Sequence, residues 1–187
     1  IATWGKGIAN GFSFCAMTGK KEIMDLGGIL TEGEEKVFLI STTHGGETHS
    51  IRAGIKTIEE FKNKNVVQHT KELGKKIIFN TNKIIKKYGL EDFVEVIPCS
   101  WMVSFNFKNE QRKACGLHRT LFLQEMIKNN ILFQGIFIPS FSHSETEIKL
   151  FSLAFEKAIK VYEKALKGDV KKYLVGKPIK AVFRKLI

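Results

Sequence analysis

A lysine set among glycines is the residue best suited to covalent chemistry. It stands in Gly5-Lys6-Gly7, with Gly11 shortly after it and an apolar run over residues 12–17 directly behind. Glycine allows backbone conformations closed to other residues and lets a planar ligand approach the main chain closely. A lysine that forms an imine must lose its proton, which partly buried and crowded surroundings favour. These residues therefore indicate either a reactive lysine on a tight turn or an ordinary solvated turn lysine.

A second segment, Thr42-Thr43-His44-Gly45-Gly46, combines hydroxyls with glycines and is followed by a helical pattern. Hydroxyls, backbone amides and a helix N-terminus can hold a phosphate without a full positive charge. Capping of the next helix by Thr48 or a nearby hydroxyl explains the same residues without any ligand. His44 and His49 do not have the spacing of paired metal ligands on one helical face, so we expect hydrogen-bonding roles for them.

The first segment resembles a known cofactor-binding sequence. Gly5-Lys6-Gly7-Ile8-Ala9-Asn10-Gly11-Phe12, followed by Met17-Thr18-Gly19-Lys20-Lys21-Glu22-Ile23-Met24, is similar to the pyridoxal-phosphate lysine segment of class III aminotransferases. Within that class it is most similar to the glutamate-1-semialdehyde 2,1-aminomutase group, and the resemblance extends over essentially the whole chain. It implies that Lys6 forms an imine with pyridoxal 5'-phosphate and moves protons between substrate and cofactor.

The resemblance also implies a reaction class and an assembly. The substrate would be a small amino-aldehyde or amino/keto acid, handled by an aminomutase or by an aminotransferase (transaminase) with a separate amino donor. In the family a threonine of the second segment reaches the cofactor phosphate of the other subunit of a homodimer. The matching position is Thr43, with Thr42 as the alternative register. Many relatives read Gly-Asn-Pro after this threonine, whereas this chain has Gly46-Glu47-Thr48, which leaves the substrate open.

Other parts of the family's active site precede the lysine segment. They are the phosphate-binding glycine/serine turn, the aromatic residue that stacks on the ring, and the aspartate that pairs with the pyridinium nitrogen. The chain begins at Ile1, close to Lys6 and without an initiator methionine. We therefore expect a C-terminal portion of a larger enzyme that is inactive alone. A non-catalytic dimerisation or binding piece is the alternative of a different class.

The expected fold is α/β, with an α+β arrangement in the C-terminal part, as in fold-type I enzymes. The polar run Lys62-Asn63-Lys64-Asn65 is the expected junction. Residues 1–63 would then be the C-terminal end of the cofactor-binding large domain, and residues 64–187 a small C-terminal domain with antiparallel strands backed by helices. Periodicity and turn residues predict strands over 11–17, 37–41, 94–97, 101–107 and 131–138, and helices over 20–26, 51–61, 66–88, 117–130 and 144–166.

Two further residues have competing interpretations. Arg119 could bind a substrate carboxylate with its planar guanidinium, or it could be solvated or paired within the protein. His143 precedes Ser144, which is expected to cap a helix together with Glu147 in a capping box. His143 is therefore expected to belong to the helix entry, with a place next to the substrate as the second interpretation.

Composition limits the partners and the compartment. The chain has 187 residues and a formal net charge of +11. Its lysines are spread over helical patterns without regularly alternating aromatic residues, so we do not expect nucleic-acid binding. No signal peptide or membrane span is predicted.

The odd number and wide spacing of Cys15, Cys99 and Cys115 favour free thiols in a cytoplasmic protein rather than disulfides or a metal site.

Overall fold

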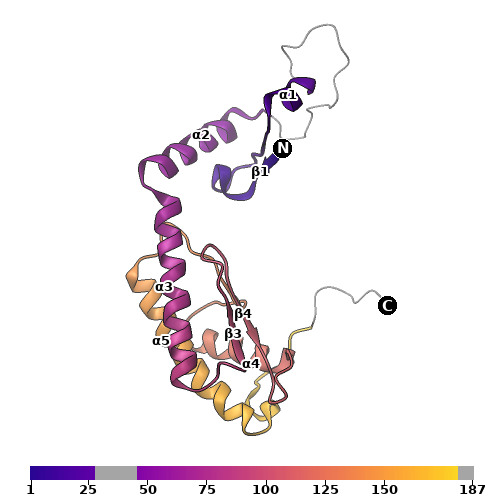
Figure 1. Ribbon diagram of the computed structural model, residues 1–187, viewed down its shortest axis with the longest axis vertical. Helices are drawn as coiled ribbons and strands as arrows, with labels where there is room; N and C mark the ends of the chain where they lie inside the picture. The colour runs from indigo at the N-terminus through magenta and orange to yellow at the C-terminus, as the bar shows by residue number, and fades with distance from the viewer. Residues whose placement is uncertain (28–45, 181–187) are drawn as a thin grey trace, which may run out of the picture. The chain divides into compact units, whose positions relative to one another are not determined.

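The computed structural model describes residues 1–27 and 46–180 (Figure 1). The chain divides into two compact units, Ile1–Val66 and Val67–Ile187. Both helices and strands are present, in agreement with the predicted α/β class. In the described part of the chain, no helix combines the length and the apolar character needed to cross a membrane.

The described part of the first unit contains a small β-ribbon and a long helix. Its elements are β1 (Ala2–Trp4), η1 (Lys6–Ala9), β2 (Ala16–Thr18), α1 (Lys21–Met24), η2 (Asp25–Gly27) and α2 (Thr48–Asn63). β1 pairs antiparallel with β2, with Trp4 opposite Ala16. Trp4 Nε1 also donates a hydrogen bond to Thr18 Oγ1, with a length of 2.9 Å. The ribbon therefore closes the intervening residues into a loop that carries the lysine segment.

The strand predicted over residues 11–17 is largely wrong. Only Ala16–Thr18 is a strand, because Asn10 and Gly11 have positive φ angles of 47° and 110° and turn the chain first. The short helix predicted over 20–26 is present as α1 followed by η2, and α2 confirms the amphipathic helix. The strand predicted over 37–41 lies outside the described residues.

The second unit is a three-stranded antiparallel sheet with helices. Its elements are α3 (Val66–Lys87), β3 (Val94–Ile97), β4 (Val103–Phe107), α4 (Gly116–Lys128), β5 (Ile136–Phe137), α5 (Glu145–Leu166) and η3 (Val170–Tyr173). The strands lie side by side in the order β3-β4-β5, and both pairings are antiparallel. This confirms the antiparallel, helix-backed layer predicted from the sequence. Gly89, with φ 61°, follows the end of α3, as glycine commonly does after a helix.

Aromatic side chains of β4, α4 and α5 form much of the core of this unit. Phe107 stacks on Phe122 with ring centroids 4.4 Å apart, and Phe155 lies edge-on to Phe122. The Tyr162 hydroxyl accepts a hydrogen bond from Lys108 N and donates to the carbonyl oxygens of Lys108 and Phe93. A phenol buried in this way needs such partners, because an unpaired hydroxyl in the core would be costly.

Two strand boundaries differ from the prediction. β4 begins at Val103 rather than residue 101, and Trp101 is 72% exposed in the preceding turn. The strand predicted over 131–138 is reduced to Ile136–Phe137, and Leu132 is 88% exposed. Gly135 lies in the left-handed region, with φ 85°, so the chain cannot remain extended across the whole apolar run.

The start of α5 confirms a prediction made from residue types alone. Ser144 is the N-cap residue, and its side chain accepts a hydrogen bond from Thr146 N. The Glu147 carboxylate accepts a hydrogen bond from Ser144 N at 2.7 Å, which completes the capping box. Hydrogen bonds from Ser144 Oγ and Ser144 N hold the pKa of the Glu147 carboxyl below its usual value.

Candidate active site around Lys6

Lys6 is the first residue of η1, and Gly5 alone separates it from the end of β1. Its φ angle is 49°, a left-handed conformation that is uncommon for a residue with a side chain. The flanking glycines leave room on either side, since a Cβ added at Gly5 or Gly7 would meet no atom within 4 Å. The side chain is exposed rather than partly buried, so the described residues alone do not supply the crowded surroundings expected from the sequence.

The loop that carries Lys6 packs against helix α2. η1 contacts α2, and Ala9 is only 1% exposed. Further along the loop, the Phe14 ring lies against Gly54 of α2, where an added Cβ would be 3.1 Å from two ring carbons. Phe12 meets His49 edge-on with a centroid distance of 5.9 Å. The position of Lys6 therefore depends on a helix that lies much later in the sequence.

The N-terminus of α2 is only partly described. Thr43, His44 and the alternative Thr42 lie outside the described residues, so their predicted roles remain predictions. Gly46 has φ 78° and turns the chain just before α2. Glu47 is the N-cap residue of α2, and its side chain makes no capping hydrogen bond. The prediction that Thr48 caps this helix is wrong, because Thr48 is the first residue inside the helix. His49 lies 3.3 Å from the Glu47 carboxylate.

Comparison with known proteins decides the family. The family model for aminotransferase class III matches residues 1–159, a range that begins before Lys6 and ends within α5. The chain belongs to the class III aminotransferases. The expected α/β fold of the fold-type I kind is therefore confirmed, as is the resemblance to this class.

The relatives of this chain are distant in sequence. It is 29% identical over 134 residues to a 3-aminobutyryl-CoA aminotransferase of Cloacimonas acidaminovorans, covering 72% of this chain and 30% of that protein. A glutamate-1-semialdehyde 2,1-aminomutase of Campylobacter hominis is 27% identical over 184 residues, covering 92% of this chain and 39% of that protein. An ethanolamine-phosphate phospho-lyase homolog 1 of Caenorhabditis elegans is 32% identical over 101 residues, covering 54% of this chain and 20% of that protein. The chain thus spans well under half the length of these relatives.

The residues around Lys6 fit the cofactor of class III aminotransferases. Among the residues that the structure describes, Lys6 Nζ has no hydrogen-bond or ion-pair partner, so its amine is available for a covalent bond. The open space beside Gly5 and Gly7 would admit a planar ring close to the main chain. Lys6 would hold pyridoxal phosphate covalently, and no other described residue of this loop offers a nucleophilic amine.

Arg119 and His143 have structural partners in the second unit. Arg119 Nη2 donates to Gln134 O at 2.8 Å, and its guanidinium lies beside Gly135. His143 Nδ1 accepts a hydrogen bond from Ser140 N, and the carbonyl oxygen of His143 lies 3.0 Å from His69 Nε2. These contacts favour the paired interpretation of Arg119 and the helix-entry interpretation of His143.

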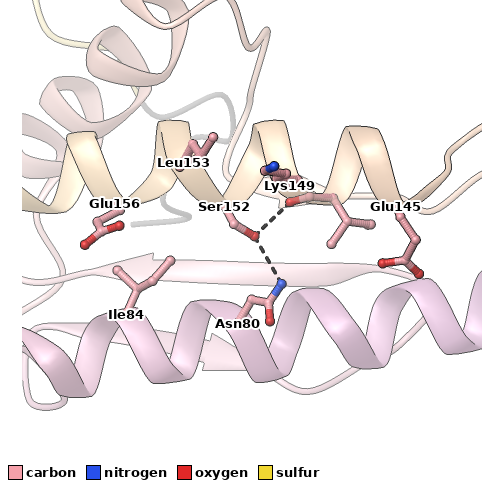
Figure 2. Close-up of a pocket in the computed structure, with 8 residues that line it drawn as sticks. Asn80, Ile84, Glu145, Lys149, Ser152, Leu153 and Glu156 are labelled. Carbon is pink, nitrogen blue, oxygen red and sulfur yellow. Dashed lines mark hydrogen bonds between the residues drawn. The ribbon is translucent and has the colours of Figure 1, made fainter.

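A pocket between α3 and α5 offers no comparable chemistry (Figure 2). It has a volume of about 230 Å³, and Asn80 Nδ2 donates to Ser152 Oγ across it at 3.2 Å. The two carboxylates on its wall, Glu145 and Glu156, pair with Lys76 and Lys87 respectively. We interpret this pocket as a groove of helix packing. In the described ranges, no cluster of histidine, cysteine and acidic residues could hold a metal ion.

His118 is a buried titratable residue that the sequence did not single out as unusual. It is 2% exposed, and neither ring nitrogen has a hydrogen-bond partner among the described residues. Its ring lies edge-on to Tyr162, and Glu110 Oε2 is 4.0 Å from Nε2. Burial lowers the pKa of His118 from its ordinary value, and the Glu110 charge opposes this only in part.

This histidine predicts a pH dependence of stability. At a pH below the ordinary pKa of 6.5, His118 binds a proton in the unfolded chain but stays neutral in the folded protein, because its folded pKa is lower. The free energy of unfolding therefore falls as the pH falls. His118→Leu should remove this slope and, at pH 7, raise stability by about 1 kcal/mol, because it removes an unpaired buried polar group. Urea unfolding of both proteins between about pH 7 and pH 5, where histidine titrates more than the carboxylates do, measures both effects. An unchanged slope in the variant would contradict the assignment.

Proposed function

We propose that the protein carrying this chain is a pyridoxal-phosphate-dependent aminomutase or aminotransferase, most similar in reaction to glutamate-1-semialdehyde 2,1-aminomutase. It would move an amino group on a small amino-aldehyde or amino/keto acid. The observation that carries the proposal is Lys6, an available amine between two glycines in the first residues of a chain matched by the class III family model. Two relatives support it, because their names, an aminomutase and an aminotransferase, denote reactions of this class.

Lys6 has two roles in this proposal. Its Nζ binds the cofactor covalently until the substrate amine takes its place. The released amine of Lys6 would then take the proton from the substrate carbon as a general base and deliver it to the cofactor as a general acid. Bound pyridoxal phosphate supplies the electron-withdrawing ring that makes this carbon acidic. The exposure of Lys6 leaves its Nζ accessible to both partners.

The assembly in this proposal is a homodimer with shared active sites. Residues 1–63 would be the end of the cofactor-binding large domain and residues 64–187 the small C-terminal domain. A stripe of isoleucines on α2 supports an interface, because Ile51, Ile55 and Ile58 follow one helical face and are 38%, 46% and 44% exposed.

The free thiols Cys15, Cys99 and Cys115 are consistent with the proposed cytoplasmic location.

One experiment tests the role of Lys6 directly. The protein is loaded with pyridoxal phosphate, reduced with borohydride and digested, and the modified peptide is mapped by mass spectrometry. We expect the pyridoxyl group on Lys6. A pyridoxyl group fixed on a different lysine, or none, would refute the proposal and favour a non-catalytic dimerisation or binding role.

The aminotransferase alternative is supported by the 3-aminobutyryl-CoA aminotransferase among the relatives. It differs from the mutase in needing a separate amino donor. Incubating the loaded protein with one candidate substrate at a time distinguishes the two reactions. Product formed from an amino-aldehyde without a donor indicates a mutase, and product that requires an added amino acid indicates a transferase.

Thr43 provides a further prediction. Its hydroxyl is proposed to donate a hydrogen bond to the cofactor phosphate of the other subunit. Thr43→Ala should weaken cofactor binding about tenfold or more, since a hydrogen bond to a charged group contributes roughly 1.5–3 kcal/mol. Thr43→Ser keeps the hydroxyl and should bind nearly as well. Equal cofactor affinity of the alanine variant and the unmodified protein, measured by fluorescence titration, would contradict this role of Thr43.

A further inference from the structure

The loop that carries Lys6 has almost no core of its own. Between β1 and β2, Ala9 is the one fully buried residue, while Ile8 and Phe14 are half-buried and the others are exposed. Such a loop cannot hold a costly conformation by itself, and Lys6 has a φ angle of 49°. Strained backbone persists only where the surrounding structure determines it. The structure that determines the conformation of Lys6 must therefore lie outside the loop.

Helix α2 supplies that surrounding structure through a face of small residues. Ser50 and Gly54 are the buried residues of α2 and lie one turn apart. Glycine is a poor residue for a helix interior, and alanine would favour the helix. At Gly54, however, an added Cβ would lie 3.1 Å from Cδ1 and Cε1 of Phe14. This separation is shorter than ordinary van der Waals contact, so a larger residue would push the Phe14 ring away.

The Phe14 ring is connected to Lys6 through a closed loop. At one end of this loop, Trp4 pairs with Ala16 and also hydrogen-bonds to Thr18. A displacement of Phe14 cannot easily pass into β2, because this pairing holds the strand in register. We expect it to pass instead into residues 5–13, where Ala9 packs η1 against the same helix. Lys6 would then be free to relax from its left-handed conformation.

We propose that Gly54 is a positioning residue for Lys6, acting through its contact with Phe14. The absence of a side chain at position 54 lets the loop sit close to α2 and fixes where the Lys6 amine is presented. This inference rests on the proposed function of Lys6 as the cofactor-binding lysine. The contact itself is a property of the chain without any cofactor, so it can be tested separately.

The test uses Gly54→Val in the full protein, with two measurements. The first is amide hydrogen exchange of residues 7–15 without cofactor, which should become at least tenfold faster while the second unit is unchanged. The second is the fraction of Lys6 that carries a borohydride-fixed pyridoxyl group at a fixed, subsaturating concentration of pyridoxal phosphate. We expect that fraction to fall at least tenfold.

Two further variants make the test specific. Arg52→Val places the same β-branched residue at an exposed position of α2 and should leave both measurements within twofold of the unmodified protein. Phe14→Leu combined with Gly54→Val removes the ring edge that the valine meets and should restore at least half of the labelling. A non-specific effect on the helix would instead affect Arg52→Val equally and would not be rescued.

The outcomes separate this inference from the proposed function. If Gly54→Val matches the unmodified protein in both measurements, the positioning role is wrong, although Lys6 can still bind the cofactor. If the unmodified protein never carries a pyridoxyl group on Lys6, the proposed function is wrong. In that case the exchange measurement alone still decides whether Gly54 positions the loop.

Discussion

Replacing Lys6 by alanine is expected to lower the turnover of the loaded protein by about four orders of magnitude. The variant loses the covalent bond to the cofactor and the amine that moves the substrate proton, and a positioned general base alone contributes roughly 10²–10⁴-fold. Stability should change little, because Lys6 is exposed and has no described partner. Single-turnover kinetics measures the loss, and thermal unfolding checks that the variant remains folded.

The matched control for this prediction is Lys6→Arg. Arginine keeps the positive charge and the length of the side chain, but its guanidinium remains protonated and does not serve as a base. A loss as large as that of the alanine variant would show that the amine chemistry of Lys6 matters rather than its charge. Substantial turnover in either variant would contradict the proposed role, as would a loss explained entirely by unfolding.

The helices of this chain could be predicted because their signals are local. The period of apolar residues gave α2 and α3, and the residue pair Ser144 and Glu147 gave the start of α5. The short strands could not be predicted as well. β5 has only two residues, and its limits depend on pairing with β4 and on the left-handed Gly135. Such features are set by tertiary structure and not by the pattern of a short window.

The candidate site shows the same division between local and distant information. Lys6 could be selected from its immediate neighbours, because glycines on both sides of a lysine are visible in the sequence. Its left-handed conformation and its support by α2 could not be predicted, since the contact of Phe14 with Gly54 joins segments that are far apart in the sequence. The burial of His118 was equally inaccessible, because it depends on Tyr162 of α5 and not on the residues beside it in α4.

Gly74→Ala is expected to destabilise the second unit by about 3 kcal/mol, through overpacking of a site that has no space. Gly74 is buried within α3, and a Cβ at this position would lie 1.7 Å from the carbonyl oxygen of Ser100. No side-chain rotation can relieve that overlap, because the obstructing atom belongs to the backbone. The turn between β3 and β4 resists movement, since Cys99 N bonds to Ile97 O and Met102 N bonds to Cys99 O.

Gly116→Ala is the matched control for this substitution. Gly116 begins α4 in the same unit, and an added Cβ there would come no closer than 3.8 Å to another atom, Ile179 O. Alanine at this position should be neutral or slightly stabilising because of its higher helix propensity. Thermal unfolding should therefore show a fall in Tm on the order of 10 °C for Gly74→Ala and none for Gly116→Ala. Equal Tm values for the two variants would mean that α3 can move away from the Ser100 carbonyl, and that this helix and turn are not held together by direct backbone contact.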